Sequence, residues 1–210
     1  MKESWQEIKD QVHATKHKIA GRVILGCHPA VGIYALPDLV LKLQKNYPAI
    51  ELCLQHDLSR TLTTAAIERI IDLGLVINPL RHPDLVIRPL LTDEVGFWIA
   101  KDLNFKNVHE HQIIADPNLI QSQALLRKIS NKKNPLKPIL ATSQLEIVTS
   151  LTLAGAGIGI LPQRVALAMG RKGLRKIPEL PTYRDELCLI YRPERRERPA
   201  VRALLDLLKP

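Results

Sequence analysis

Short polar side chains and two cations follow the strands that we expect in this sequence, and these residues have the types and spacing needed for ligand chemistry. In an open α/β sheet, ligands bind beyond the carboxyl ends of the strands. Hydroxyls, backbone N–H groups at helix starts and the charges of Arg60 and Lys101 favour an anion such as a carboxylate. The candidate ligand-binding residues are His28, Pro29, Ala30, Ser59, Arg60, Thr61, Asn78, Lys101 and Ser143.

Each candidate also has a purely structural interpretation. Ser59, Thr61 and Ser143 are residue types that commonly cap helix N-termini. His28 stands before a proline and fits a role in shaping a turn, while Asn78 fits simple strand termination. Taken singly these structural roles are favoured, but the convergence of the residues at one end of the strands favours a binding site.

Motifs that would indicate an enzyme are missing from the sequence. It has no GxSxG elbow, no Walker loop, no HExxH and no spaced pair of carboxylates. The run AGAGIGIL at 154–161 lacks GxGxxG spacing and follows an expected helix, so we expect a glycine turn between a helix and a strand. We therefore expect no catalytic residues and no cofactor.

The histidines and cysteines show no metal-ligand spacing, and we expect no metal site. Cys27, Cys53 and Cys188 are far apart in the sequence, and each lies in or beside a hydrophobic run. Buried, reduced thiols in a cytoplasmic protein fit this pattern. Cys27 is the exception to watch, because it comes directly after the first expected strand.

The elements that would position the candidates alternate between strands and helices. Continuously apolar strands, such as RVILG, are typical of a sheet covered on both faces. The order strand, helix, strand, helix, strand within sixty residues is the βαβ pattern of an open α/β sheet. The expected elements of this first part are strands 22–26, 50–54 and 73–77 and helices 34–47 and 62–70.

A second α/β unit begins near residue 90, and a separate helix, at residues 4–18, opens the chain. That opening helix has a capping-box spacing from Ser4 to Glu7 and a thin apolar stripe. The remaining expected elements are strands 95–100, 112–115, 137–141 and 187–191 and helices 119–129, 145–153, 163–169 and 199–208.

Charge and hydropathy exclude several classes of protein. The net charge is +9, and the last fifty residues are rich in arginine, but acidic residues are interleaved with them. No aromatic platform or helix-turn-helix pattern accompanies the arginines, so we expect a solvated basic face and no direct DNA binding. No apolar run reaches the roughly 20 residues of a membrane span. The polar N-terminal segment has no signal-peptide core, and we expect a cytoplasmic protein.

Five segments in register resemble landmarks of the effector-binding domain of LysR-type transcriptional regulators. They are GRVILG, LPDLVLKLQKNYPAIEL, IDLGLVI, PLLTDEVGFWIA and LTLAGAGIGILP, and the resemblance runs from about residue 20 to the C-terminus. It implies two Rossmann-like α/β lobes joined by two crossover strands, like a type II periplasmic binding protein. By this likeness residues 1–19 end a linker helix, 20–90 plus 186–210 form lobe I, and 91–185 form lobe II.

The resemblance also implies a function and a site. An effector, here a small anion, would bind in the interlobe cleft at the loop after the first strand, at Ser59 and around Ser143. Ala30 stands where many members carry Ser or Thr, so only a backbone N–H contact carries over there. Arg69 stands where glycine is common, which should alter a turn.

The partners that the resemblance implies are an effector, a homodimer or tetramer, and DNA. The DNA would be bound only through a winged helix-turn-helix that precedes residue 1 in the family. We expect no membrane partner. The alternatives are a periplasmic-type solute-binding receptor of the same fold, and a transferase or dehydratase built on it.

Overall fold

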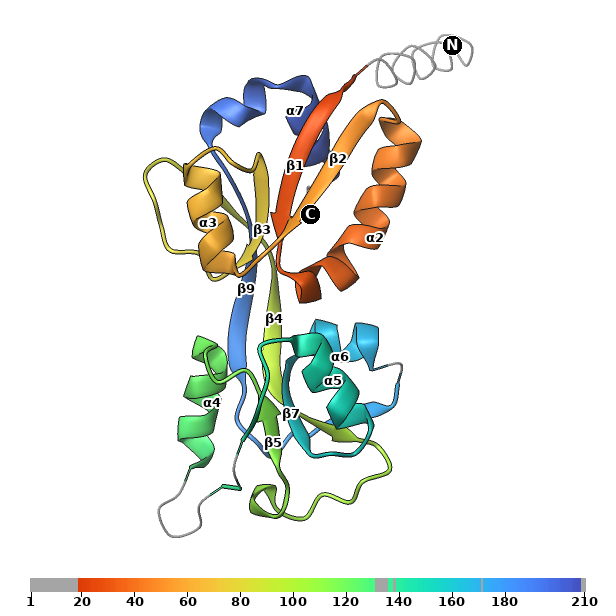
Figure 1. Cartoon of the computed structure of the whole chain (residues 1–210), viewed down its shortest axis with the longest axis vertical. Helices are drawn as coiled ribbons and strands as arrows, with labels where there is room; N and C mark the ends of the chain where they lie inside the picture. Colours follow the sequence, from red (N-terminus) through yellow and green to blue (C-terminus); the bar gives the residue numbers. More distant parts are fainter. Residues whose placement is uncertain (1–18, 131–135, 138, 171, 209–210) are drawn as a thin grey trace, which may run out of the picture. The chain divides into compact units, whose positions relative to one another are not determined.

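The computed structural model describes residues 19–130, 136–137, 139–170 and 172–208, in two compact units (Figure 1). The first unit comprises residues 1–91 and 186–210, and the second comprises residues 92–185. The sequence analysis placed these boundaries at residues 90/91 and 185/186. The chain passes between the units inside two strands, β4 (Val86–Ala100) and β9 (Tyr183–Tyr191). The helix expected at residues 4–18 lies outside the described residues.

The sheet of the first unit has the strand order β2-β1-β3-β9. Strand β1 (Gly21–Cys27) runs parallel to both β2 (Ile50–His56) and β3 (Leu73–Ile77). Strand β9 is antiparallel to β3. The carboxyl ends of β1, β2 and β3 therefore meet at one edge, which we call the carboxyl edge of the first unit.

Helices cover both faces of this sheet, as continuous hydrophobicity predicts. The α2 helix (Pro29–Asn46) and the α7 helix (Pro199–Leu207) share one core with Leu25 of β1. The α3 helix (Ser59–Ile67) packs on the opposite face (Figure 1). Its approach requires Gly26, where a Cβ would lie 2.7 Å from a methyl group of α3.

Helix α2 begins five residues earlier than the sequence analysis expected, at Pro29 instead of Tyr34. His28 is its N-cap, with its Nδ1 accepting a hydrogen bond of 3.2 Å from the Ala30 N–H. Proline suits the first helical position because its φ is preset and the missing N–H has no partner to lose. The expected loop after the first strand is therefore largely the first turn of α2.

The sheet of the second unit has the order β4-β7-β5-β6, with the short strand β8 paired to β4. Strand β7 is parallel to β5 and antiparallel to β4. The sequence analysis missed β8 and both 3₁₀ helices. The remaining elements of the described residues are β5 (Ile113–Ala115), β6 (Leu140–Ala141), β7 (Ile158–Pro162), β8 (Leu174–Lys176), α4 (Ile120–Ile129), α5 (Leu145–Leu153), α6 (Gln163–Met169), η1 (Val108–Glu110) and η2 (Pro193–Glu197).

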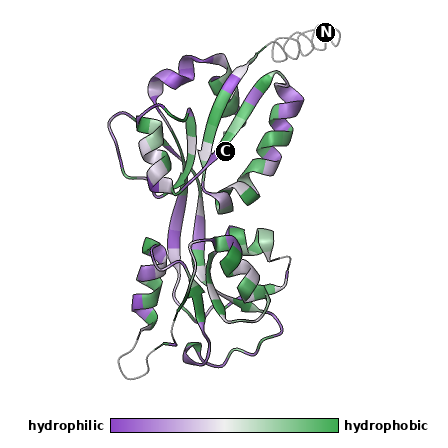
Figure 2. Ribbon diagram, viewed as in Figure 1, coloured by the Kyte–Doolittle hydropathy of each residue, from purple (hydrophilic) through white to green (hydrophobic). Residues whose placement is uncertain are grey.

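The core of the second unit joins β4, β5 and β7 to α4, with Phe97 fully buried. The glycine run forms the turn from α5 to β7, as predicted, with Gly155 at φ +80°. Gly159 lets α5 approach, because a Cβ there would lie 2.3 Å from the Thr152 hydroxyl. Much of each sheet is hydrophobic, but β4 and β9 each carry a hydrophilic stretch, and the helices carry both hydrophobic and polar positions (Figure 2). Among the described residues, we find no helix with the length and apolarity to span a bilayer.

Candidate ligand-binding edge

A thiol and an imidazole meet at the carboxyl edge of the first unit. Cys27 and His56 are register partners on β1 and β2, and Cys27 Sγ lies 3.6 Å from His56 Nδ1. The same nitrogen lies 3.1 Å from the Cys27 carbonyl oxygen. That contact is a hydrogen bond when Nδ1 carries the proton. Gly32 of α2 completes the cluster, because its missing side chain faces both residues.

Ser59 links the start of α3 to the end of β3. Its Oγ accepts a hydrogen bond of 2.9 Å from the Ile77 N–H. The N-cap of α3 is Leu58, which makes no side-chain cap, so the capping interpretation of Ser59 is wrong. A hydroxyl that accepts from an N–H keeps its own proton to donate. The half-buried Ser59 is thus a fixed donor at this edge.

Some of the other first-unit candidates are exposed to a ligand, whereas others already make hydrogen bonds within the protein. Arg60 and Thr61 lie exposed in the first turn of α3. The Ala30 N–H, expected to contact ligand, already donates to His28, and Pro29 has no N–H to offer. Asn78 has φ +47° and its Oδ1 accepts from the Glu186 N–H at 2.8 Å, so it fastens β3 to β9. Ser59, Arg60 and Thr61 are therefore the side chains at this edge that are most available to bind a ligand.

The two candidates in the second unit lie at opposite edges of its sheet. Ser143 follows β6 and is exposed next to Gln144, which is the N-cap of α5, so the capping interpretation of Ser143 is wrong. Lys101 follows β4, which runs antiparallel to β7. The carboxyl end of β4 thus lies at the amino ends of β5 and β7, away from Ser143. Lys101 and Ser143 do not share a site.

His56 was not among the candidates that the sequence predicted. The parallel register of β1 and β2 brings its ring to Cys27 across 29 residues of chain. Only the βαβ pattern hinted at this proximity, because parallel neighbours end at one edge.

The thiols of Cys27 and Cys188 are buried and held neutral. Burial raises the pKa of Cys27 to about 11 and that of Cys188 to about 12, where the neighbouring Glu186 adds to the effect. Cys53 is partly exposed and accepts a hydrogen bond from Arg22. Among the described residues no group of histidines, cysteines and carboxylates is arranged to hold a metal ion.

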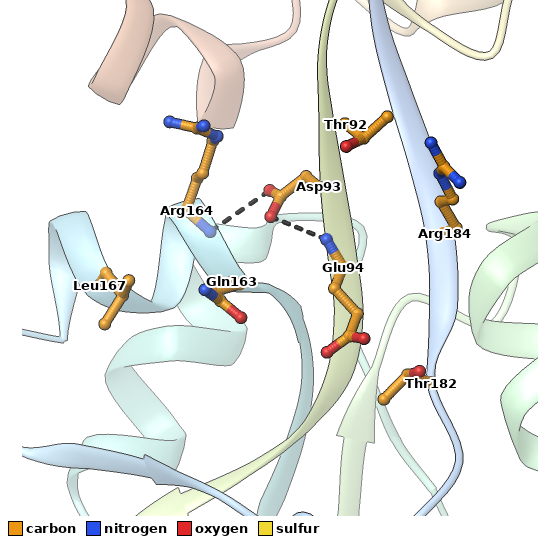
Figure 3. Close-up of a pocket in the computed structure, with 8 residues that line it drawn as sticks. All are labelled: Thr92, Asp93, Glu94, Gln163, Arg164, Leu167, Thr182 and Arg184. Atoms are coloured by element: carbon orange, nitrogen blue, oxygen red, sulfur yellow. Dashed lines mark hydrogen bonds between the residues drawn. The ribbon is translucent and has the colours of Figure 1, made fainter.

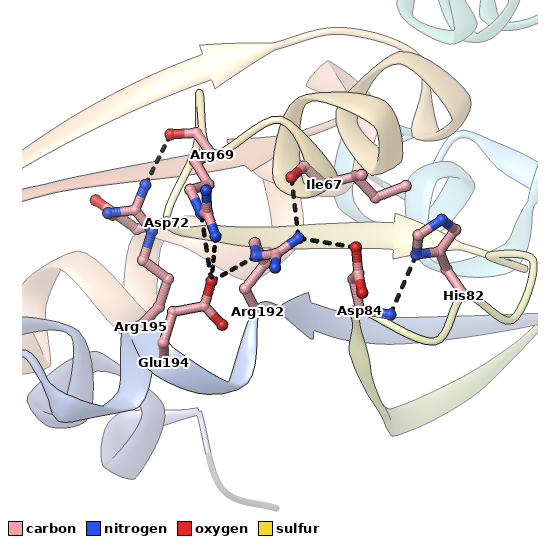
Figure 4. Close-up of polar contacts among 8 residues, drawn as sticks. All are labelled: Ile67, Arg69, Asp72, His82, Asp84, Arg192, Glu194 and Arg195. Carbon is pink, nitrogen blue, oxygen red and sulfur yellow. Dashed lines mark hydrogen bonds and ion pairs between the residues drawn. The ribbon is translucent and has the colours of Figure 1, made fainter.

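Three arginines near the C-terminus form ion pairs within the first unit, and two of them, Arg192 and Arg195, are drawn in Figure 4. Asp72, 4% exposed, forms ion pairs with Arg195 at 3.2 Å and with Arg198. Arg192 pairs with Asp84 at 3.1 Å and with Glu194 at 2.6 Å. These side chains fasten the C-terminal segment to β3 and its flanking loops. Arginines held in this way are less available as phosphate ligands.

The fold is that of a substrate-binding regulatory domain. Residues 16–210 match the LysR substrate binding domain, and the chain belongs to that family. The predicted fold, two α/β lobes like a type II periplasmic binding protein, is confirmed by this match and by solved LysR regulatory domains.

Individual relatives are regulators or their regulatory domains. The chain is 22% identical to the transcriptional regulator BbuR of Bordetella bronchiseptica over 75% of its own length, and it spans 51% of BbuR. It is 26% identical to a hydrogen peroxide-inducible genes activator of Haemophilus influenzae, covering 96% of this chain and 74% of the activator. The chain thus spans about half the length of BbuR.

Two solved structures illustrate the shared fold. The CrgA regulatory domain of Neisseria meningitidis has a TM-score of 0.74 at 20% identity, covering 90% of this chain and 97% of that one. A sulfate-bound variant of the OxyR2 regulatory domain from Vibrio vulnificus has a TM-score of 0.68 at 19% identity, covering 90% and 95%.

Proposed function

We propose that this chain senses a small anionic effector at the carboxyl edge of the first unit and forms the regulatory part of a LysR-type transcription factor. The observation that carries the proposal is the Ser59 hydroxyl, fixed by Ile77 with a proton left to donate. Arg60 follows it in the same helical turn and adds a cation that matches carboxylate and phosphate geometry. The sulfate in the OxyR2 relative agrees with an anionic ligand.

Sensing requires that the effector bind one state of the assembly more tightly than another. We propose that the regulator is a cytoplasmic homodimer or tetramer, and that DNA is bound by a separate winged helix-turn-helix in the same protein. The interlobe position of the effector and the contact at Ser143, both implied by resemblance, stay predictions. In this scheme the chain binds its ligand without transforming it.

Thiol oxidation is a poor alternative signal for this chain, although some relatives are named for induction by hydrogen peroxide. A reactive cysteine needs an accessible thiolate. Cys27 and Cys188 are buried and have raised pKa values, and all three cysteines of the described residues, Cys53 of β2 included, are free thiols. A bound small molecule therefore fits the edge better than an oxidant.

A thermal-shift screen of the full chain against carboxylates, amino acids, inorganic phosphate and sulfate tests the proposal. A ligand at about 100 times its Kd should stabilise the protein by roughly 2.7 kcal/mol. The shift should be lost in Ser59→Ala and Arg60→Gln, each compared with its own ligand-free melting temperature. Arg127→Gln, an exposed arginine on α4, is the charge-matched control and should keep the shift. A shift that survives both first-unit substitutions would place the effector elsewhere.

A further inference from the structure

The second unit contains a polar hollow that the effector edge does not use. It has a volume of about 520 Å³ and lies between the middle of β4, the start of α6 and the start of β9 (Figure 3). Pockets of roughly 300–1,000 Å³ are typical of small-molecule sites. The side chains relevant to binding are Thr92, Asp93, Gln163, Arg164, Leu167 and Arg184.

The acidic groups of the hollow are already engaged by the protein. Asp93 is 9% exposed, and its two carboxylate oxygens accept hydrogen bonds from the backbone N–H groups of Glu94, at 2.8 Å, and Arg164, at 3.3 Å. Glu94 forms an ion pair with Lys176 of β8. Each carboxylate thus has its charge or its lone pairs occupied, and neither dominates the charge presented to a ligand.

The cationic groups are placed on two sides of the hollow. Arg184 projects from β9 and Arg164 from α6, with Thr92 and Asp93 of β4 between them (Figure 3). The Arg184 guanidinium is exposed and, within residues 19–130, 136–137, 139–170 and 172–208, has no hydrogen-bond or ion-pair partner. A guanidinium presents a planar set of donors that matches a carboxylate in bidentate fashion.

Neutral groups complete the lining. The Thr92 hydroxyl and the Gln163 amide offer both donors and acceptors, and Leu167, 60% exposed, supplies an apolar wall. This mixture suits a ligand with a short apolar body and charged ends.

We infer that this hollow is a second ligand site, which takes a small dicarboxylate with one carboxylate toward Arg184 and the other toward Arg164. All residues that line the site belong to the second unit, and none of them is a residue of the carboxyl edge. Its existence does not depend on the effector proposed for that edge. Two cations on opposite sides favour a dianion over a monoanion, because a single carboxylate engages only one of them.

Isothermal titration calorimetry of the full chain with succinate, acetate and inorganic phosphate tests the inference. Succinate should bind more tightly than acetate or phosphate. Arg184→Gln and Arg164→Gln should each weaken succinate binding roughly tenfold or more, as expected for loss of a charge-assisted hydrogen bond. Arg184→Lys keeps the charge but loses the bidentate geometry and should give an intermediate affinity.

Controls separate this site from the effector edge. Ser59→Ala and Arg127→Gln should leave succinate binding unchanged, so a failure at one site does not imply a failure at the other. The inference is overturned if succinate does not bind at tens of millimolar, or if it binds no better than acetate or phosphate. It is equally overturned if Arg184→Gln leaves the affinity intact, or if only Ser59→Ala removes it.

Discussion

Replacement of Asp72 by alanine should destabilise the first unit more than any other removal of a single acidic side chain described above. Asp72 precedes β3, and its Oδ2 accepts a hydrogen bond of 2.9 Å from the Ile24 N–H of β1. Its Oδ1 forms ion pairs with the guanidinium groups of Arg195 and Arg198 from the C-terminal segment. One buried carboxylate therefore joins two strands and the end of the chain.

The expected loss follows from these contacts. Breaking a buried ion pair by removing one partner costs about 3–5 kcal/mol. The arginine side chains of Arg195 and Arg198 are 22% and 41% exposed, so water compensates part of that loss. The orphaned Ile24 N–H adds a penalty of about 1–3 kcal/mol. We expect a decrease of about 3 kcal/mol in the free energy of unfolding, a large part of the roughly 5–15 kcal/mol of a typical domain.

Urea unfolding followed by far-UV circular dichroism measures this change. Asp72→Asn keeps an oxygen for the Ile24 N–H and should lose less than Asp72→Ala. Asp84→Ala is the matched control, because Asp84 also pairs with an arginine but its side chain is 49% exposed. That control should cost less than about 1 kcal/mol. If Asp72→Ala and Asp84→Ala destabilise the protein equally, the reasoning about buried charge is wrong.

Three further perturbations test other features of the chain. Iodoacetamide at pH 8 should label Cys53 on the native protein but not Cys27 or Cys188, since a pKa of about 11 leaves only about one Cys27 thiol in a thousand ionised. Measurement of the intact mass should show one label on the native protein and three after unfolding. Rapid labelling of Cys27 in the native protein would contradict its burial. Arg69→Gly should raise the melting temperature. Glycine removes the cost of about 1–2 kcal/mol that a side chain carries at φ +64°, whereas the lost surface ion pair with Glu194 contributes at most about 1 kcal/mol. A lower melting temperature would show that Arg69 is not strained. Hydrogen bonding to an arginine lowers the pKa of Glu194 to about 2. The ionised Glu194 side chain therefore stabilises the protein fully above the ordinary glutamate pKa near 4, and this stabilisation is lost as the pH falls toward 2. The difference in unfolding free energy between wild type and Glu194→Gln should shrink over that interval, and a constant difference would argue against the pKa shift.

The sequence predicted the bounds of helices and strands correctly where glycines, prolines or apolar periodicity mark their ends. Strand β3 and helices α5 and α6 have the predicted bounds, because apolar periodicity, glycines and prolines mark their ends. The start of α2 was missed because its N-cap is His28, a residue type that is uncommon at that position. The Schellman-type end of α3 is closed by Arg69 in a left-handed conformation, where the sequence analysis expected an altered turn.

The parts of the site that escaped prediction depend on strand direction and on contacts between distant residues. Lys101 follows a strand as Ser143 does, but the pattern of apolar residues carries no information on whether β4 runs with or against β7. Ser59 has the residue type of a helix cap, yet its partner is Ile77, which is 18 residues away on another strand. Such contacts are set by the assembled sheet and not by the neighbouring sequence.

The first unit is assembled from two separated stretches of chain, and this arrangement sets an order on its maturation during translation. Strand β9 and helix α7 supply Leu187, Leu189 and Leu204 to the core that contains β1 and α2. Until these last segments leave the ribosome, β3 has an unpaired edge and α2 covers only part of its core, while residues 92–185 are already available to fold. Exposed strand edges and apolar surfaces favour aggregation. A nascent chain stalled before residue 186 should consequently hold a folded second unit and an incomplete first one.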